Sequence, residues 1–224
     1  MKIILASGSP RRYDLLKQMG WDVEVRSLPF AEAETVSGAE EQLKILRNNF
    51  LINGAAQHNE RFSEKDLVLL SAYSNADLVC AYNALGKGKA VATVAGTKVP
   101  VIAADTIVVL GEKILGKPAD SADAVRMLRE LSGREHEVKT ATAVFYQDKT
   151  LLRVVTTKVH FRMLSEKETG WYVKTGEPLD KAGAYGIQGK GAVLVEKIEG
   201  SYDNVVGLPL STLYEMFLKL GIPV

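Results

Sequence analysis

The N-terminal stretch KIILASGSPRRYDLL, residues 2–16, predicts a strand, a tight turn and a helix start in direct succession. The apolar run 3–5 is typical of a short buried strand, and the small residues that follow it form a turn. Ser9 is a favourable N-cap, because its hydroxyl can accept a hydrogen bond from an unpaired backbone N–H, and Pro10 suits the first helical position. This unit is the first of a series in which strands and helices alternate.

The start of this helix also predicts an anion site. A helix N-terminus carries roughly half a positive charge and several unpaired N–H donors. Arg11 and Arg12 add two guanidiniums beside it, and the combination is typical of a phosphate-binding turn. The alternative is that Ser9 and Pro10 only cap a helix and that both arginines are solvated.

The pattern along the chain predicts an α/β fold with a mixed sheet. Expected strands are 2–6, 22–26, 100–110, 137–147, 150–163 and 192–198, and expected helices are 10–19, 76–94, 121–131, 166–174 and 209–220. Gly133 and Gly221 are helix stops, and Ser165 with Glu168 forms a capping box. Two long strands that meet at Asp148-Lys149 indicate a hairpin, which favours a mixed sheet over a parallel one.

Residues 38–75 interrupt this alternation. An amphipathic helical segment, a polar segment and a short apolar segment follow one another there. We interpret the region as a helical insertion that packs on a lobe edge or at a homodimer interface. The alternative is a solvent-facing helical excursion without chemistry.

Composition excludes several classes of protein. The 224 residues are 46% hydrophobic and 25% charged, with a net charge of +1, so no global field favours nucleic acid or an anionic membrane. The single cysteine, Cys80, excludes an internal disulfide and fits a reducing compartment. No apolar segment reaches the roughly 20 residues of a membrane span, and the N-terminus lacks a signal-peptide pattern. We therefore expect a cytoplasmic protein.

Asp105 is the most informative single acid. It lies with Thr106 inside VPVIAADTIVVL, residues 99–110, an otherwise apolar strand. Burying an ionised carboxylate without a partner costs several kcal/mol, so this acid needs a cation, a metal or a donor network. The alternative is an acid that caps a neighbouring turn.

Two glycine-bearing segments could also contact a ligand. GEKILGKP, residues 111–118, places Lys117 where a P-loop has its lysine, but Pro118 replaces the required Ser or Thr, so a Walker A site is excluded. Residues 176–192 hold five glycines with charged residues and Gln188 among them, and the Gln188 amide could pair with a base edge. Each segment could equally be an ordinary loop with solvated polar side chains.

The remaining candidates are weaker alone. His58, His136 and His160 show no ligand spacing, which excludes a His/Cys zinc site. Glu32 and Glu34 follow the second strand and could serve Mg²⁺, although solvated acids are the simpler interpretation.

Seven motifs stand in the order expected of the Maf family of nucleoside triphosphate pyrophosphatases, historically linked to septum formation, and the chain resembles that family over 1–37 and 76–222. They are LASGSPRR, KA at Lys89-Ala90, AADT, LGKP, SGREHEV, EPLDKAGAYGIQG and GSYDNVVGLPL. The resemblance implies one Maf-like domain over 1–224, with 38–75 as an insertion. It further implies a twisted mixed sheet flanked by helices, in two lobes around a central cleft, similar to inosine-triphosphate pyrophosphatases.

The resemblance also implies the reaction NTP + H₂O → NMP + PPi with a divalent metal, Mg²⁺ or alternatively Mn²⁺. By motif match, Asp105 is the general base for water attack on the α-phosphorus. Glu32 joins it in holding the metal, with Glu34 as the alternative. The phosphate ligands implied in the same way are Ser7, Arg12, Lys89 and Lys117.

Three positions that vary with substrate class within the family are Arg11, Thr106 and Gln188 here. This combination resembles the dTTP/UTP pyrophosphatase branch, and modified pyrimidine nucleotides are further candidate substrates. The 7-methyl-GTP branch carries an aromatic residue, Gln and Glu instead. A glutamine amide suits the carbonyls and N3–H of uracil or thymine.

Two other functions stay open. A nucleotidyltransferase also begins with a strand, a glycine-bearing loop and an arginine, but it transfers the nucleotidyl group to an acceptor. A non-enzymatic nucleotide-binding regulator of cell division would arrest division without cleaving its ligand.

Overall fold

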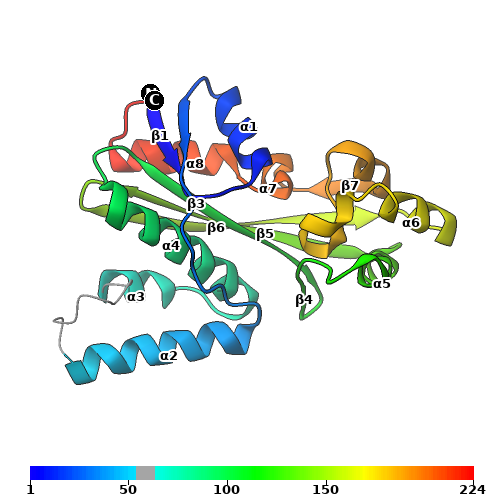
Figure 1. Ribbon diagram of the computed structural model, residues 1–224, viewed down its shortest axis with the longest axis horizontal. Helices are drawn as coiled ribbons and strands as arrows, with labels where there is room; N and C mark the ends of the chain where they lie inside the picture. The colour runs from blue at the N-terminus through cyan, green and yellow to red at the C-terminus, as the bar shows by residue number, and fades with distance from the viewer. Residues whose placement is uncertain (54–63) are drawn as a thin grey trace. The chain divides into compact units, whose positions relative to one another are not determined.

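The computed structural model describes the backbone of residues 1–53 and 64–224 and the side chains of 1–45 and 65–224. Its strands form one sheet in the order β2-β1-β3-β5-β6-β7, with β4 paired to β3 (Figure 1). β1 is parallel to β2 and β3, whereas β4 is antiparallel to β3 and β7 is antiparallel to β6. The predicted mixed sheet is confirmed. The strands are β1 Lys2–Leu5, β2 Asp22–Val25, β3 Val101–Leu110, β4 Lys113–Leu115, β5 Glu135–Tyr146, β6 Lys149–Phe161 and β7 Val195–Glu199.

The helices also follow the sequence pattern closely. All five expected helices form within one or two residues of the predicted bounds. The short helix α7 and the short strand β4 were not predicted. The helices are α1 Pro10–Gln18, α2 Val36–Asn53, α3 Glu64–Leu70, α4 Asn75–Ala95, α5 Ser121–Leu131, α6 Glu166–Val173, α7 Tyr202–Val206 and α8 Leu210–Leu220, with 3₁₀ turns at Glu177–Asp180, Ala182–Ala184 and Gly189–Leu194.

The chain divides into two compact units. The first unit contains Met1–Asp105, Ala141–Val154 and Leu210–Val224, and the second contains Thr106–Thr140 and Val155–Pro209. The boundary therefore falls inside β3, between Asp105 and Thr106. A division into two lobes agrees with the expectation from sequence, and the central cleft stays a prediction.

Helix α4 is the element of the first unit that positions most of the candidate site. Two glycines let aromatic rings reach its backbone: a Cβ on Gly86 would lie 2.0 Å from the Phe30 ring, and one on Gly88 would lie 2.3 Å from the Phe145 ring. Such contacts are shorter than any real Cβ makes, so a larger residue at either position would push a ring away. The two glycines therefore fix α4 on both sides of Lys87.

α2 begins two residues before the predicted helical region 38–75, which also includes α3 and the first residue of α4. Both α2 and α3 contact α4 (Figure 1). Residues 54–63, which include His58, lie outside the described residues. Lys89 on α4 forms a salt bridge of 3.0 Å with Asp66 on α3, and the Asp66 side chain is only 2% exposed. This buried ion pair ties α3 to α4. That the region is an insertion, or a homodimer interface, stays a prediction.

The second unit has its own apolar core. Buried side chains of β3, β5, β6, α5 and α6 pack together there, with Leu128, Leu131, Val159 and Tyr172 among the most buried. His136 is also buried in this unit, and a hydrogen bond of 2.7 Å joins its Nε2 to the phenol oxygen of Tyr185, a member of this core. Burial lowers the pKa of His136 to about 4.

Local capping signals mostly agree with the structure. Gly133 follows α5 with φ +67°, and the capping box of Ser165 and Glu168 is present. Ser9 occupies the N-cap of α1, but its side chain makes no capping hydrogen bond, contrary to the expectation. Instead, the Ser9 N–H donates to Ser7 Oγ, 3.3 Å away. Within the described parts of the chain, no helix combines the length and apolar character needed to cross a membrane.

Candidate active site

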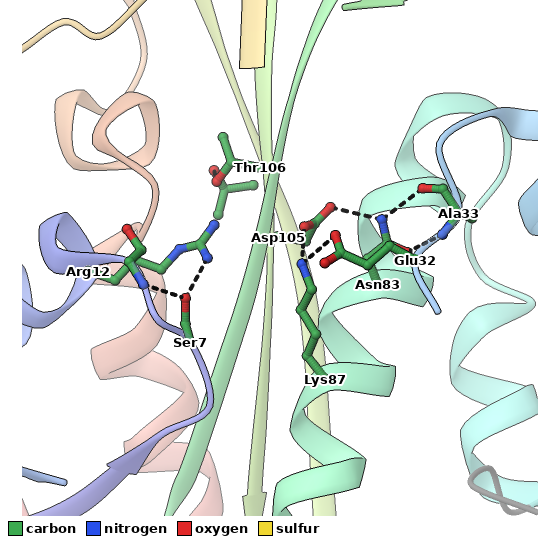
Figure 2. A network of polar contacts seen from close by, with 10 residues as sticks. Ser7, Arg12, Glu32, Ala33, Asn83, Lys87, Asp105 and Thr106 are labelled. Carbon is green, nitrogen blue, oxygen red and sulfur yellow. Dashed lines mark hydrogen bonds and ion pairs between the residues drawn. The ribbon is translucent and has the colours of Figure 1, made fainter. Parts of the chain in front are cut away.

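Asp105 is a buried acid with two direct partners, as its place in an apolar strand predicts. Asp105 is 7% exposed to solvent. Lys87 Nζ donates to Oδ1 at 2.7 Å, and Asn83 Nδ2 donates to Oδ2 at 3.2 Å (Figure 2). Both donors come from one face of α4, because residues four apart on a helix lie one above the other. A cation and an amide donor together offset the cost of burying this charge.

Asn83 is itself held rigidly. The Ala33 N–H donates to Asn83 Oδ1 at 2.8 Å, and Asn83 Nδ2 donates to the Ala33 carbonyl at 2.9 Å. The amide therefore binds the backbone of the segment after β2 at two points and gives its second N–H to Asp105. This arrangement satisfies all the donors of the amide. It also fixes the position of Glu32, the neighbour of Ala33.

Lys87 joins the two predicted metal ligands. Its Nζ lies 2.7 Å from Glu32 Oε2 and 2.7 Å from Asp105 Oδ1. The Glu32 side chain is 49% exposed, whereas that of Asp105 is 10% exposed. Two carboxylate oxygens from separate segments thus converge on one cationic atom.

Arg12 and Ser7 form the other part of the site within the first unit. Arg12 Nη1 donates to Ser7 Oγ at 2.9 Å, and Ser7 is buried (Figure 2). Burial lowers the pKa of Arg12 from its ordinary value, while the Asp105 carboxylate raises it and Arg11 lowers it. A guanidinium stays charged under such shifts. The turn after β1 therefore brings a fixed cation into the electrostatic reach of Asp105.

The structure does not bring Lys89 to Asp105. Lys87 and Lys89 are two residues apart on α4, so their side chains point about 200° apart around the helix axis. Lys87 faces Asp105 and Lys89 pairs with Asp66. The predicted phosphate role of Lys89 stays a prediction, and the lysine that stands in the cluster is Lys87.

Other predicted residues lie elsewhere in the fold. Arg11 follows Pro10 on α1, and the exposed Glu34 follows Ala33. Thr106 Oγ1 and Thr140 Oγ1 share a hydrogen bond of 2.9 Å in the second unit. Lys117 and Gln188 also belong to that unit, and both are exposed. Their approach to Asp105 stays a prediction.

The glycine-bearing segment 176–192 satisfies most of its own charges. Glu177 accepts a hydrogen bond from the Lys190 N–H at 3.2 Å, and Lys181 Nζ pairs with Asp180 Oδ1 at 2.6 Å. The charged residues among the glycines therefore stabilise the loop itself. Gln188 stands at the start of the last 3₁₀ turn, and its side-chain amide is exposed.

The donor set around Lys87 fits a hard divalent cation. Glu32 and Asp105 present carboxylate oxygens to the same cationic atom, and carboxylate oxygens are the protein ligands that Mg²⁺ prefers. These two acids are therefore suited to hold the metal that the family resemblance implies.

Sequence reasoning missed Lys87 and Asn83. The sequence did carry a signal for them: positions 83 and 87 are four apart, and only one of the two lysines in GKGK can share a face with Asn83. A polar pair at that spacing on an otherwise buried helix indicates the face that meets Asp105.

A search of solved structures finds a chain similar over its whole length. The Ham1 protein of Staphylococcus aureus matches with a TM-score of 0.46 and 14% identity, covering 99% of this chain and 100% of that one.

Sequence comparisons give a far closer likeness. A protein named dTTP/UTP pyrophosphatase from Dictyoglomus thermophilum is 42% identical, with 98% of this chain and 96% of the relative aligned. Proteins of the same name from Salmonella typhimurium and Aquifex aeolicus are 42% and 39% identical, covering 96% and 99% of this chain and 90% and 97% of the relatives. The family model described as Maf-like protein matches residues 2–220. With the ordered motifs and near-complete coverage, the chain belongs to the Maf family.

Proposed function

We propose that this protein hydrolyses dTTP and UTP to the nucleoside monophosphate and pyrophosphate. The observation that carries the proposal is the buried Asp105 carboxylate, held by Lys87 and Asn83 on one side and within the field of Arg12. Relatives about 42% identical over nearly the whole chain bear the name of this activity.

Asp105 is the proposed general base. It takes a proton from a water molecule whose oxygen bonds to the α-phosphorus, and the bond from that phosphorus to the bridging oxygen of the β-phosphate breaks. Pyrophosphate leaves with the electron pair of that bond. Asn83 and Lys87 hold one carboxylate oxygen each, so the base has a fixed orientation, which is what a general base needs to act on a bound water.

Charge on the triphosphate is the second requirement. The leaving pyrophosphate gains negative charge as the bond breaks, and fixed cations lower the energy of that state. We assign this role to Arg12 and Arg11 at the start of α1, with Lys117 as a further ligand. Lys89, which the family resemblance also implies as a phosphate ligand, pairs with Asp66 in this structure and keeps that role as an expectation. The Ser7 hydroxyl accepts from Arg12 and from the Ser9 N–H, which leaves its own proton to donate to a phosphate oxygen.

Glu32 and Asp105 would hold the divalent metal. When bound, Mg²⁺, or alternatively Mn²⁺, neutralises phosphate charge and polarises the phosphoryl group. The Lys87 ammonium pairs with the same two acids. The cluster therefore combines two acids with a lysine and an arginine in one unit of the fold.

Base selection is the proposed role of Gln188, with Thr106 and Arg11. The Gln188 amide offers a donor and an acceptor, which suits the edge of uracil or thymine and extends to modified pyrimidines. Cytoplasmic location stays a prediction from the sequence, in line with the use of free nucleotides.

Product analysis tests the proposal. Purified protein with dTTP or UTP, Mg²⁺ and no acceptor should release the monophosphate and pyrophosphate in equal amounts. GTP and ATP should be used far less well. A requirement for an acceptor molecule would indicate a nucleotidyltransferase. Binding of dTTP without turnover would indicate a regulator and would overturn the proposal.

A further inference from the structure

The outer face of the second unit gathers three metal-binding side chains that are far apart in sequence. Glu135 begins β5, His160 is next to last on β6, and Glu199 ends β7. His160 Nε2 lies 3.1 Å from Glu135 Oε2 and 3.3 Å from Glu199 Oε1. One potential ligand atom from each residue lies within 4.8 Å of the other two.

Strand pairing builds this cluster. β6 lies between β5 and β7 in the sheet, and His160 pairs in register with Lys197, two residues before Glu199. A backbone hydrogen bond of 3.1 Å from the Phe161 N–H to the Arg134 carbonyl aligns β6 with the start of β5. Val159 and Phe161 point into the core, so His160 points to the opposite face. The sheet itself therefore holds the imidazole between two carboxylates.

The position of His160 Nε2 between two carboxylates is typical of a metal-ligating nitrogen. Nε2 of His160 is inaccessible to solvent and makes no hydrogen bond of acceptable geometry, although both carboxylate oxygens are close. This nitrogen therefore lies beside two carboxylate oxygens without a hydrogen bond to either. In a metal site, neighbouring donors approach in this way because their lone pairs point to a common centre rather than to one another.

Two lysines compensate the acids but do not block them. Lys158 Nζ is 3.1 Å from Glu135 Oε1, and Lys197 Nζ is 2.9 Å from Glu199 Oε1. Both lysine side chains are about half exposed, at 47% and 57%. Exposed ion pairs contribute little stability and exchange readily. A divalent cation could displace both ammonium groups, which would then be solvated.

We propose that Glu135, His160 and Glu199 bind one divalent transition-metal ion of the zinc class. Metal–ligand bonds of about 2.0–2.1 Å in tetrahedral geometry place neighbouring ligand atoms about 3.3–3.4 Å apart, close to the two distances around His160. Imidazole as the central ligand favours Zn²⁺, Co²⁺ or Ni²⁺ over Mg²⁺. Because the three ligands come from β5, β6 and β7, the bound ion would link these three strands at the edge of the sheet.

Calorimetric titration of the full chain with Zn²⁺, without nucleotide and in a buffer that does not chelate metals, tests the proposal. The wild type should bind one equivalent that excess Mg²⁺ does not displace. Glu135→Gln and Glu199→Gln should each weaken binding at least ~10-fold, and His160→Ala should abolish it. The matched control is Glu137→Gln, because Glu137 is the next acid on the same face of β5 and pairs with Lys139. It should bind Zn²⁺ as the wild type does.

Two results would overturn the proposal: no Zn²⁺ binding by the wild type, or wild-type affinity in His160→Ala, which would place the ion elsewhere on the chain. Circular dichroism of each variant verifies the fold. The Mg²⁺-dependent hydrolysis of dTTP, measured on the same samples, should be unchanged in His160→Ala. Because the Zn²⁺ titration uses no nucleotide, its result does not depend on whether the protein hydrolyses dTTP.

Discussion

Lys87→Met and Lys89→Met separate the candidate site from ordinary structural ion pairing. Both lysines lie on α4, and each substitution removes an ammonium from a salt bridge to a buried aspartate on another element. Lys87 pairs with Asp105, whose side chain is 10% exposed, and Lys89 pairs with Asp66, whose side chain is 2% exposed. Lys87 also pairs with the half-exposed Glu32, a contact that contributes little stability. The two variants are therefore close matches in structural damage, whereas only Lys87 touches the proposed base.

The expected loss of stability is similar for both. Removing one partner of a fully buried ion pair costs about 3–5 kcal/mol, because a charge is left uncompensated. The lysine side chains here are 19% and 28% exposed, so water can replace part of the lost interaction. We expect each variant to lower the free energy of unfolding by about 2–3 kcal/mol.

The expected loss of activity differs. Lys87→Met removes a charge-assisted hydrogen bond that orients Asp105 and should lower kcat/KM for dTTP about 10²-fold, the range seen for single donors in a charged site. Lys89→Met should lower it less than ~3-fold, once both variants are assayed well below their unfolding transitions. Urea denaturation and pyrophosphate release on the same preparations measure the two effects. An equally large loss in Lys89→Met would support the phosphate role that the family resemblance implies for Lys89, whereas near-normal activity in Lys87→Met would refute the assignment of Lys87 to the site.

Further predictions concern the base, its support, the core histidine and the base-selective amide. Asp105→Asn should lower turnover at least ~10²-fold in a pyrophosphate-release assay, and a near-normal rate would reject Asp105 as the base. Asn83→Leu removes both hydrogen bonds to the Ala33 backbone and so loosens the neighbouring Glu32, the proposed metal ligand. The variant should need a higher Mg²⁺ concentration for its half-maximal rate, and an unchanged metal dependence would contradict this role. His136 has a folded pKa of about 4, below its ordinary 6.5, so it stabilises the fold above pH 6.5 and this contribution falls by about 3 kcal/mol as the pH drops to 4. The double variant His136→Phe, Tyr185→Phe should show a flatter loss of unfolding free energy across that window, and an unchanged slope would exclude His136 as its source. Gln188→Glu should weaken use of UTP and dTTP more than it weakens pyrophosphate inhibition, and equal loss would refute its role in base selection.

Asp105 shows what can be predicted from sequence. An acid in the middle of an apolar strand must have a compensating partner, and that argument needs no knowledge of the fold. The structure supplies the partner as Lys87, and the spacing of four from Asn83 favours it over Lys89 only once Asn83 is known to face Asp105. The choice depends on the rotation of α4 about its axis, to which the close approach of Phe30 to Gly86 and of Phe145 to Gly88 contributes.

The cluster around His160 shows what the sequence hides. Its residues are 25 and 39 positions apart, so no spacing along the chain indicates them. Only the register of β6 with its neighbours brings them together. A histidine that shows no ligand spacing in the sequence can therefore lie between carboxylates when adjacent strands carry acids at the matching level. Helix and strand bounds were predicted more reliably, because caps such as Ser165 and stops such as Gly133 act locally.

Hydrolysis of dTTP in ¹⁸O-labelled water is the most direct measurement of the central claim, that Asp105 directs water to the α-phosphorus. Mass spectrometry of the products should find one labelled oxygen in dTMP and none in pyrophosphate, and the rate of label transfer should collapse in Asp105→Asn. Label in pyrophosphate, or release of inorganic phosphate with dTDP, would place the attack on another phosphorus and contradict the account.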